Sequence, residues 1–239
     1  MTKELKYKMI ENYILKKIDS GEYKIGEQIP TEYELCKMFQ VGRMTVNKAI
    51  NNLERRNLIK RISGKGSFVI RRVSRSVTAL GSFTKDMERV GMKASSKLIE
   101  FRLATGKDFP EEAYELALKP EDGILFFRRI RYGDNITIAV SETFLVEKCF
   151  PNFNPSILDG SLDEYMASQG YTTEEFSISI EAIMAQKEHK IYLGLPLNEE
   201  APLLKSTTKR YFQGNPYEYT RTFYISEHFE YTFSGGIDK

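Results

Sequence analysis

The sequence predicts an α+β protein of two parts, and three observations support this. Apolar residues recur at helical spacing through the first third of the chain, where two short β-like runs follow them. Farther along, two pairs of alternating runs form hairpins whose turns lie 80 residues apart. Basic residues are concentrated in the first third. We therefore expect three helices and a hairpin first, and then an antiparallel sheet with helices.

The charge is divided unevenly between these two parts. Residues 1–75 hold 17 Lys and Arg against 8 Asp and Glu, a net charge of +9. Since the whole chain has 35 Lys and Arg and 33 Asp and Glu, residues 76–239 hold 18 basic against 25 acidic residues, a net charge of −7. A basic part joined to an acidic one indicates that the first part binds a polyanion, with nucleic acid the leading candidate. A solvated basic face without a partner is the alternative.

Composition excludes several classes of protein. The 41% hydrophobic and 12% aromatic fractions of the 239 residues are typical of a globular chain. No apolar run reaches the ~18 residues of a membrane span, and the charged start at residues 1–6 does not resemble a signal peptide, so a cytoplasmic protein is expected. The chain has two cysteines and two histidines without zinc-ligand spacing. No metal or cofactor is therefore expected.

Three helices are expected in the first part. Apolar residues at 10, 13, 14 and 18 mark the first, which stops at Ser20 and Gly21. Thr31 and Glu34 form a capping-box pattern that starts the second, which ends near Gln40. The third spans residues 43–56 after a tight break, and its buried face carries Val46, Ala49, Ile50 and Leu53. A short turn between two such helices is typical of a helix-turn-helix.

A β-hairpin follows the helices, with strands at 58–61 and 67–70. Its tip contains Gly64, Lys65 and Gly66. The glycines allow positive φ and close approach to another surface, and Lys65 offers a cation to a phosphate. Together with the helix-turn-helix and the local charge, this wing predicts binding to double-stranded DNA.

The second part shows a repeated unit of a helix and a hairpin. Because the two copies can pair through their strands, we expect one antiparallel α+β core. The expected strands lie at 97–103, 124–132, 136–146, 175–183, 203–212 and 217–225, and the expected helices at 110–118, 161–169 and 186–193.

The first part resembles the winged-helix domain of GntR-family bacterial transcriptional regulators. The resemblance is carried by the runs at 26–32, 41–46 and 64–69. It implies operator contacts by Thr31, Glu32, Arg43, Thr45, Lys65 and Gly66. Arg43 is the expected base reader, since an arginine at the start of a major-groove helix can bond O6 and N7 of guanine.

Further DNA contacts are predicted from the chemistry of the side chains in this part. Thr31 and Thr45 are expected to hold phosphate oxygens, and the cations Lys48, Arg61 and Lys65 to add affinity without sequence information. Three positions depart from the family pattern, namely Tyr33, Gly42 and Asn47. Asn47 has the donor and acceptor that suit adenine, so we expect it to contact DNA and the operator to differ from the family's usual one.

The second part resembles the UTRA domain of the HutC subfamily, whose fold is similar to that of chorismate lyase, from Leu80 to Phe233. The signature is the run at 80–84, then 129–131, 160–162 and 217–219 leading to Tyr224. The resemblance implies a homodimeric regulator, generally a repressor, that binds a small effector such as a sugar phosphate. The expected domains are a winged helix-turn-helix at 1–72, a linker at 73–79 and an effector-binding domain at 80–239.

An anion site is expected in this second domain. Arg129 and Arg131 are two residues apart on a strand and share a face, whereas Arg128 points to the other face. Ser82 precedes a helix, where its hydroxyl and the N–H groups of Phe83 and Thr84 are expected to complete an oxyanion cradle. Ser161 heads a second helix in the same way. Helix capping by the serines and cross-strand ion pairing of the arginines are the alternatives.

Polar residues alternate on one face of the last long strand, at 218, 220, 222 and 224. The resemblance implies that Glu218 and Tyr224 bond effector hydroxyls. Two departures affect the effector's identity: Ser141 stands where relatives have glutamate, and Asp163 where they have tyrosine. Asp163 is expected to repel an anion, so the effector is not expected to be a common amino-sugar phosphate.

Two other functions compete with a ligand-controlled regulator. An enzyme of lyase-like fold fused to a DNA-binding domain is one alternative, but no nucleophile–base pair is evident and no activity is expected. A nucleic-acid binder without ligand control is the other, but it does not need the Arg129 and Arg131 face. The expected partners are operator DNA, a small anionic metabolite and a second copy of the chain, without a membrane.

Overall fold

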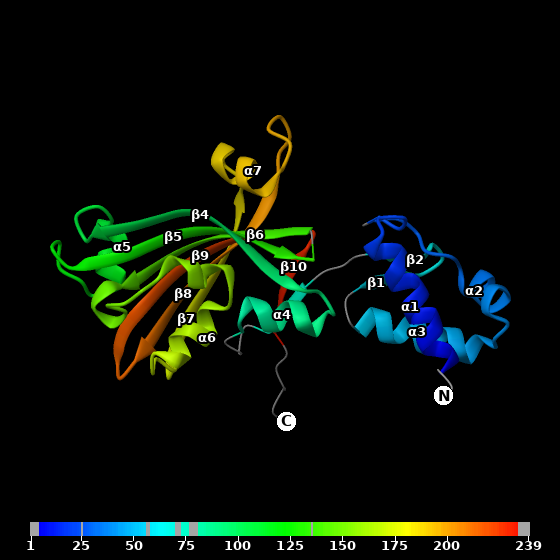
Figure 1. Cartoon of the computed structure of the whole chain (residues 1–239). Helices are drawn as coiled ribbons and strands as arrows, with labels where there is room; N and C mark the ends of the chain where they lie inside the picture. The colour runs from blue at the N-terminus through cyan, green and yellow to red at the C-terminus, as the bar shows by residue number, and fades with distance from the viewer. Residues whose placement is uncertain are drawn as a thin grey trace, which may run out of the picture. The chain divides into compact units, whose positions relative to one another are not determined.

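The computed structural model describes residues 5–24, 26–55, 58–69, 73–76, 81–134 and 136–233. The chain divides into two compact units, one of Met1–Ser74 with Arg89–Gly91 and one of Arg75–Glu88 with Met92–Lys239 (Figure 1). The boundary between the units, after Ser74, falls within the expected linker at 73–79. The first half of that linker forms strand β3 (Val73–Ser76), which pairs with β10 (Phe229–Thr232). The rest of that linker and Leu80 lie outside the described residues.

The first unit contains the three expected helices, α1 (Lys6–Asp19), α2 (Glu32–Phe39) and α3 (Arg43–Arg55). The capping box of α2 is present: Thr31 N donates to Glu34 Oε2 at 2.7 Å, and Glu34 N donates to Thr31 Oγ1 at 3.3 Å. The three helices share one apolar core, built from Ile10, Ile14, Leu35, Val46, Ile50 and Leu53.

The wing consists of the antiparallel strands β1 (Ile59–Ile62) and β2 (Gly66–Val69). Gln28, before α2, forms a bridge with Phe68, and Ile29 N donates to Ser67 O at 2.9 Å. Gly66 has a φ of +118°, and a Cβ there would come within 2.3 Å of Gln28 Nε2. Backbone pairing therefore fixes the wing to the segment that enters α2.

The second unit is built on one antiparallel six-stranded sheet of order β4-β5-β6-β9-β8-β7. The hairpins β5–β6 and β8–β9 meet where β6 pairs with β9, which confirms the predicted antiparallel core. Asn135 in the first turn lies outside the described residues. The strands are β4 (Ala94–Thr105), β5 (Gly123–Gly133), β6 (Ile136–Val146), β7 (Glu175–Met184), β8 (Pro202–Phe212) and β9 (Asn215–Ile225).

The helices of this unit are short: α4 (Phe83–Arg89), α5 (Pro110–Glu115), α6 (Leu162–Ser168) and α7 (Lys187–Leu193), with 3-10 turns at Glu147–Cys149 and Pro155–Asp159. Helix α5 stops before the expected residue 118 because Ala117 has a φ of +52°.

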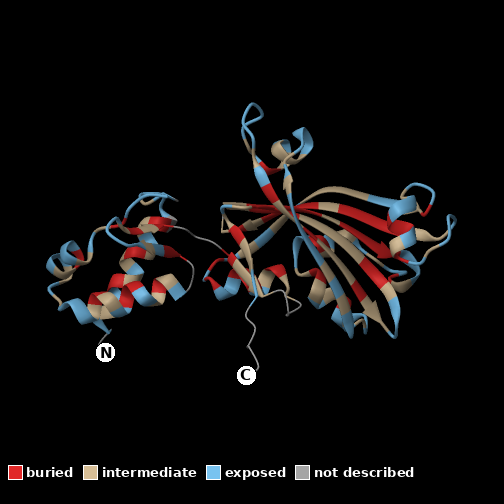
Figure 2. Ribbon diagram, turned by 180° about the vertical axis from the view of Figure 1, so that it is seen from behind, coloured by how far each residue is buried: buried red, intermediate tan, exposed pale blue. Residues whose placement is uncertain are grey.

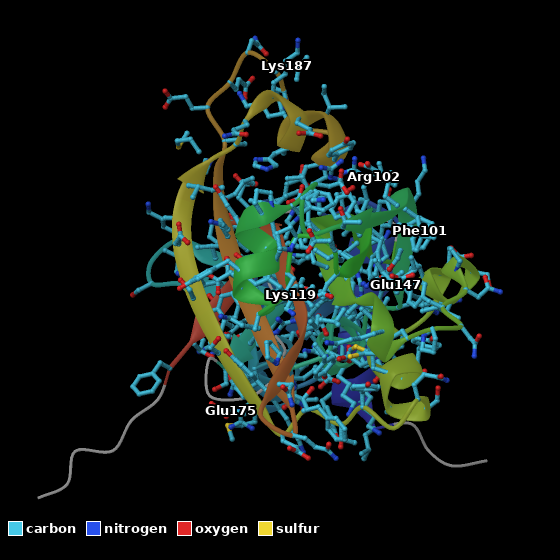
Figure 3. All side chains as sticks on the ribbon, turned by 90° about the vertical axis from the view of Figure 1, so that its left-hand side faces the viewer. Phe101, Arg102, Lys119, Glu147, Glu175 and Lys187 are labelled. Carbon is cyan, nitrogen blue, oxygen red and sulfur yellow. The ribbon has the colours of Figure 1, made fainter. Side chains whose placement is uncertain are left out.

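Figure 2 shows the buried residues of this unit concentrated along the central strands of the sheet. In Figure 3, the edge strands lie on opposite sides, β4 with Phe101 and Arg102 and β7 starting at Glu175.

Candidate functional site

The start of helix α3 presents polar side chains to solvent. Arg43 and Lys48 are exposed, and Thr45 is half-buried. Among the residues that the structure describes, no hydrogen bond or ion pair engages the Arg43 guanidinium. A surface ion pair of Arg43 with Glu54 is the alternative to DNA binding, but Glu54 instead accepts the backbone N–H of Arg61 at 3.1 Å. Arg43 is therefore available for an external ligand.

Arg61 connects the wing to both helices of the helix-turn-helix. Its Nη2 donates to Asn47 Oδ1 at 2.9 Å and lies 3.3 Å from Glu32 Oε1. All three residues are expected from the sequence to contact DNA, but their contacts with one another are not predicted from it. Bidentate adenine recognition uses the Asn47 oxygen, which here already accepts from Arg61. Asn47 and Glu32 are thus placed to orient Arg61.

The remaining predicted DNA-contacting residues surround this network. Thr31 caps α2 and is exposed, and the Lys48 ammonium lies 4.2 Å from the centre of the Tyr7 ring. Lys65 is exposed at the wing tip beside Gly66. The face therefore carries cations from both α3 and the wing.

Substituting Lys65 with alanine is expected to weaken DNA binding mainly at low salt. Each phosphate contact contributes a slope of about −0.9 to log affinity against log salt, so the slope of Lys65→Ala should be shallower by roughly one. Fluorescence anisotropy with a random duplex over a salt series measures it. Lys107→Ala, an exposed lysine of the second unit, is the control and should leave the slope unchanged.

A cavity of about 80 Å³ lies on one face of the sheet in the second unit. Its lining joins four arginines to carboxylates, hydroxyls and apolar groups. These residues include Arg75, Arg129, Arg131, Arg210, Asp163, Glu218, Ser161, Phe83 and Tyr224.

Strand register gives this cavity a floor of hydroxyl groups. Ser141 on β6 lies between Arg129 and Thr222, and the next inward-facing row contains Thr143 and Thr220. Thr220 Oγ1 donates to Glu218 Oε1 at 2.8 Å and lies 3.1 Å from Thr143 Oγ1. Such a floor can bond a polyhydroxylated ligand.

Arg129 and Arg131 are buried cations without a carboxylate partner. They are 3% and 8% exposed, and neither forms an ion pair within the described part of the chain. Arg129 Nη1 donates to Leu158 O at 3.2 Å, and the Arg131 guanidinium lies 4.4 Å from the centre of the Phe83 ring. The Nε atoms of both are buried without an acceptor.

The electrostatics of these two arginines favour an anion. Burial and then the nearby Arg131 charge lower the pKa of Arg129 well below its usual value. Burial, with a smaller contribution from the charge of Arg75, lowers the pKa of Arg131 to about 10. Because a neighbouring negative charge would offset both penalties, this end of the cavity is suited to a phosphate or carboxylate.

The cavity also contains a charge network that the sequence does not predict. Arg210 on β8 pairs with Asp163 of α6, and its Nε lies 3.5 Å from Glu218 Oε2. The ion pair with Arg210 offsets the charge of Asp163 and so weakens the repulsion of an anion that the sequence leads us to expect. Arg210 lies directly opposite Glu218 in the β8–β9 hairpin. The register of the predicted hairpin could therefore have indicated Arg210 as the partner of Glu218.

Glu218 and Tyr224 both line the cavity, as expected. Burial raises the pKa of Glu218, and its Oε2 is buried without a hydrogen bond. Burial also raises the pKa of Tyr224, whose ring stacks on Phe229 at 3.8 Å. Glu218 is therefore a buried oxygen that a ligand hydroxyl can satisfy.

The predicted oxyanion cradle of Ser82, Phe83 and Thr84 is divided by the structure. Phe83 lines the cavity with the arginines, whereas Ser82 and Thr84 line an adjoining cavity of about 450 Å³. Because the Phe83 side chain points toward the arginines at the start of α4, the adjacent side chains of Ser82 and Thr84 point toward the second cavity. Ser82 Oγ accepts from Lys85 N at 3.2 Å, and Ser161 Oγ accepts from Glu164 N at 3.3 Å, so both serines cap helices.

No helix among the described residues combines the length and apolar character that a membrane crossing needs. No group of three or more His, Cys, Asp or Glu side chains in them is arranged to hold a metal ion.

Comparison with known proteins identifies both parts of the chain. Residues 6–69 match the bacterial regulatory proteins of the gntR family, and residues 89–230 match the UTRA domain. The repressor NagR of Bacillus subtilis is 27% identical over 238 residues, which cover 98% of this chain and 95% of NagR. The mannosyl-D-glycerate transport and metabolism repressor MngR of Escherichia coli is 24% identical over 229 residues, 95% of this chain and 94% of MngR.

A solved structure shows the same fold over nearly the whole chain. PhnF from Mycobacterium smegmatis superposes with a TM-score of 0.75 and 20% identity, covering 98% of this chain and 100% of that one. The matched families are regulatory rather than enzymatic. The chain belongs to the gntR family of bacterial regulatory proteins, with a DNA-binding winged helix followed by a UTRA domain.

Proposed function

We propose that this regulator is a homodimeric repressor of the HutC subfamily, acting in the cytoplasm, whose operator affinity is controlled by a small anionic effector. The observation that carries the proposal is the pair of buried, unpaired guanidinium groups of Arg129 and Arg131 in a cavity with a hydroxyl floor. The arginines would hold the anionic group, and Glu218 and the threonines would hold hydroxyls. A phosphorylated sugar derivative has this combination of groups.

The names of similar proteins support a sugar-related effector. They include the mannosyl-D-glycerate repressor MngR and a fructoselysine utilization operon repressor of Escherichia coli, 27% identical over 175 residues. Because Arg210 compensates Asp163, the cavity remains suited to a phosphate.

A thermal-shift screen of phosphorylated sugars against their unphosphorylated counterparts tests this function. A true effector should stabilise the protein by RT ln(1 + [L]/Kd), about 2.7 kcal/mol at 100 times Kd. The same compound should then release the protein from an operator selected from a random duplex library. Stabilisation by neutral sugars alone would contradict the anion site, and stabilisation without any change in DNA affinity would contradict effector control.

Substituting Arg43 with alanine is expected to remove sequence preference rather than DNA binding. Loss of a bidentate contact to guanine should cost about 1–3 kcal/mol on the selected operator and much less on random DNA. Competition binding measures the ratio of the two affinities. Lys48→Ala is the matched control on the same helix and should weaken both duplexes alike. An equal loss on both duplexes for Arg43→Ala would exclude base reading.

A further inference from the structure

Arg75 belongs to the cavity and also to the strand that leads toward it from the DNA-binding domain. Strand β3 begins at Val73, and the wing strand β2 ends at Val69. Arg75 is the first residue of the second unit, and its side chain lines the cavity. Residue 75 falls within the linker expected from the sequence at 73–79. The structure instead makes it part of the wall of the candidate effector site.

The Arg75 guanidinium is held by a carboxylate and by aromatic rings. Its Nε donates to Asp86 Oδ2 at 2.7 Å, and Asp86 is only 1% exposed. The guanidinium also lies 5.3 Å from the ring centre of Phe229 and 5.8 Å from that of Tyr224. Tyr224 is one of the proposed effector contacts. Arg75 thus connects β3 to the cavity through charge and through packing.

Arg75 and Arg131 also repel each other. The charge of Arg75 disfavours the charged form of Arg131, and both guanidinium groups line the same cavity. An anion bound at Arg131 would reduce this repulsion and attract Arg75 away from Asp86. The bound anion would therefore change the forces on β3 without touching its backbone.

We propose that Arg75 is a further effector-binding residue, which contacts the anion beside Arg129 and Arg131 and so transmits occupancy of the cavity to β3. This inference rests on the proposed anion site. Asp86 is the partner that holds Arg75 when the anion is absent. The exchange of Arg75 between Asp86 and the anion is the step that couples the cavity to the strand.

Gly81 supports this assignment independently. It lines the cavity, and a Cβ at this position would lie 3.1 Å from Asp86 Oδ1 and 3.2 Å from Arg75 Nε. The backbone at residue 81 therefore packs directly against the ion pair. Gly81→Ala offers a way to disturb the pair without changing any charge.

The test measures anion binding and the response of β3 separately in the full chain. Inorganic phosphate is the probe, at ionic strength matched with chloride. Isothermal titration calorimetry gives its affinity, and hydrogen–deuterium exchange gives the protection of residues 73–76. In the unsubstituted protein, phosphate should bind and change exchange in β3 several-fold.

Two variants show whether a lost β3 response comes from the absence of Arg75 or from a misfolded domain. Arg75→Gln removes the positive charge beside the buried Asp86 carboxylate, so Arg75→Gln/Asp86→Asn is made alongside it to restore neutrality. Both should still bind phosphate through Arg129 and Arg131, weaker by roughly 10- to 150-fold for the one lost charge-assisted hydrogen bond, and at saturating phosphate both should lose the response of β3. Gly81→Ala should reduce that response. Arg221→Gln, which breaks an ion pair with Glu112 outside the cavity, is the control and should keep it.

The outcomes either support or overturn the proposed role of Arg75. A β3 response that persists in the neutral double variant would overturn the role of Arg75, as would phosphate binding to the unsubstituted protein without any β3 response. A complete absence of phosphate binding would overturn the anion site itself and this inference with it. Loss of the β3 response with retained phosphate binding in the double variant supports the proposal.

Discussion

Replacing Arg129 and Arg131 together with glutamine is expected to abolish anion binding while raising the stability of the ligand-free protein. Each charge-assisted hydrogen bond contributes about 1.5–3 kcal/mol, so losing one from each arginine should weaken phosphate binding at least about 100-fold. Without a ligand, burial of the two charges outweighs the attraction of nearby Glu218 and Asp163, so their removal should stabilise the fold by on the order of 1–4 kcal/mol. Calorimetry gives the affinity, and thermal unfolding with and without phosphate gives the stability.

The sign of the stability change follows from the lowered pKa values of both arginines. A base whose pKa is lower in the folded state than in the unfolded state opposes folding at every pH where it stays charged. Both guanidinium groups are charged near neutral pH, so this cost is fully present there. Glutamine removes the charge and keeps hydrogen-bonding groups in the cavity. The gain should therefore be visible at neutral pH.

Arg128→Gln is the matched control for this experiment. Arg128 directly precedes Arg129 in the sequence but lies on the other face of the sheet, where it contacts Glu100 and Glu142 at 2.8 and 2.9 Å. Its substitution should lower stability and leave phosphate binding unchanged. If the Arg129 and Arg131 double variant still bound phosphate with its original affinity, the cavity would not be the anion site.

Replacing Arg210 with methionine is expected to destabilise the second domain strongly, and more at high pH than at low pH. Arg210 is the buried cation that compensates Asp163 and Glu218. Breaking a buried pair by removing one partner typically costs about 3–5 kcal/mol, because the other charge stays buried alone. Urea unfolding at several pH values measures this loss.

The pH dependence comes from Glu218. Burial already raises the pKa of this carboxyl, and loss of Arg210 should raise it further. A carboxyl whose pKa is higher in the folded state keeps its proton there after the unfolded chain has released it, so stability falls as pH rises through that window. Arg210→Met should therefore regain part of its stability near the ordinary carboxyl range. Arg210→Met/Glu218→Gln should lose this pH dependence, and an unchanged slope in the double variant would assign it to another group.

The sequence predicted the elements well because each was specified locally. The capping box of Thr31 and Glu34 and the repeated hairpins depend on residues close together in the chain. The shared face of Arg129 and Arg131 follows from strand alternation alone. These features need no knowledge of the tertiary packing.

The missed residues are those that depend on pairs distant in sequence. Arg210 meets Asp163, 47 residues earlier, and Arg61 meets Asn47, 14 residues earlier. Arg75 contacts Tyr231, 156 residues later in the chain, because β3 pairs with β10. No periodicity or spacing encodes such contacts. The sequence therefore predicted that Arg129 and Arg131 share a face, but it did not predict that Arg210, Asn47 and Arg75 contact charged or polar groups far away in the chain.

The pairing of β6 with β9 has a consequence for how the domain opens. This pair joins the two halves of the sheet, and the cavity floor takes Ser141 and Thr143 from one half and Thr220 and Thr222 from the other. A ligand on this floor would brace the two halves against separation. Partial unfolding along this seam should therefore become rarer when the cavity is occupied, and a protease that cuts the opened form should act more slowly.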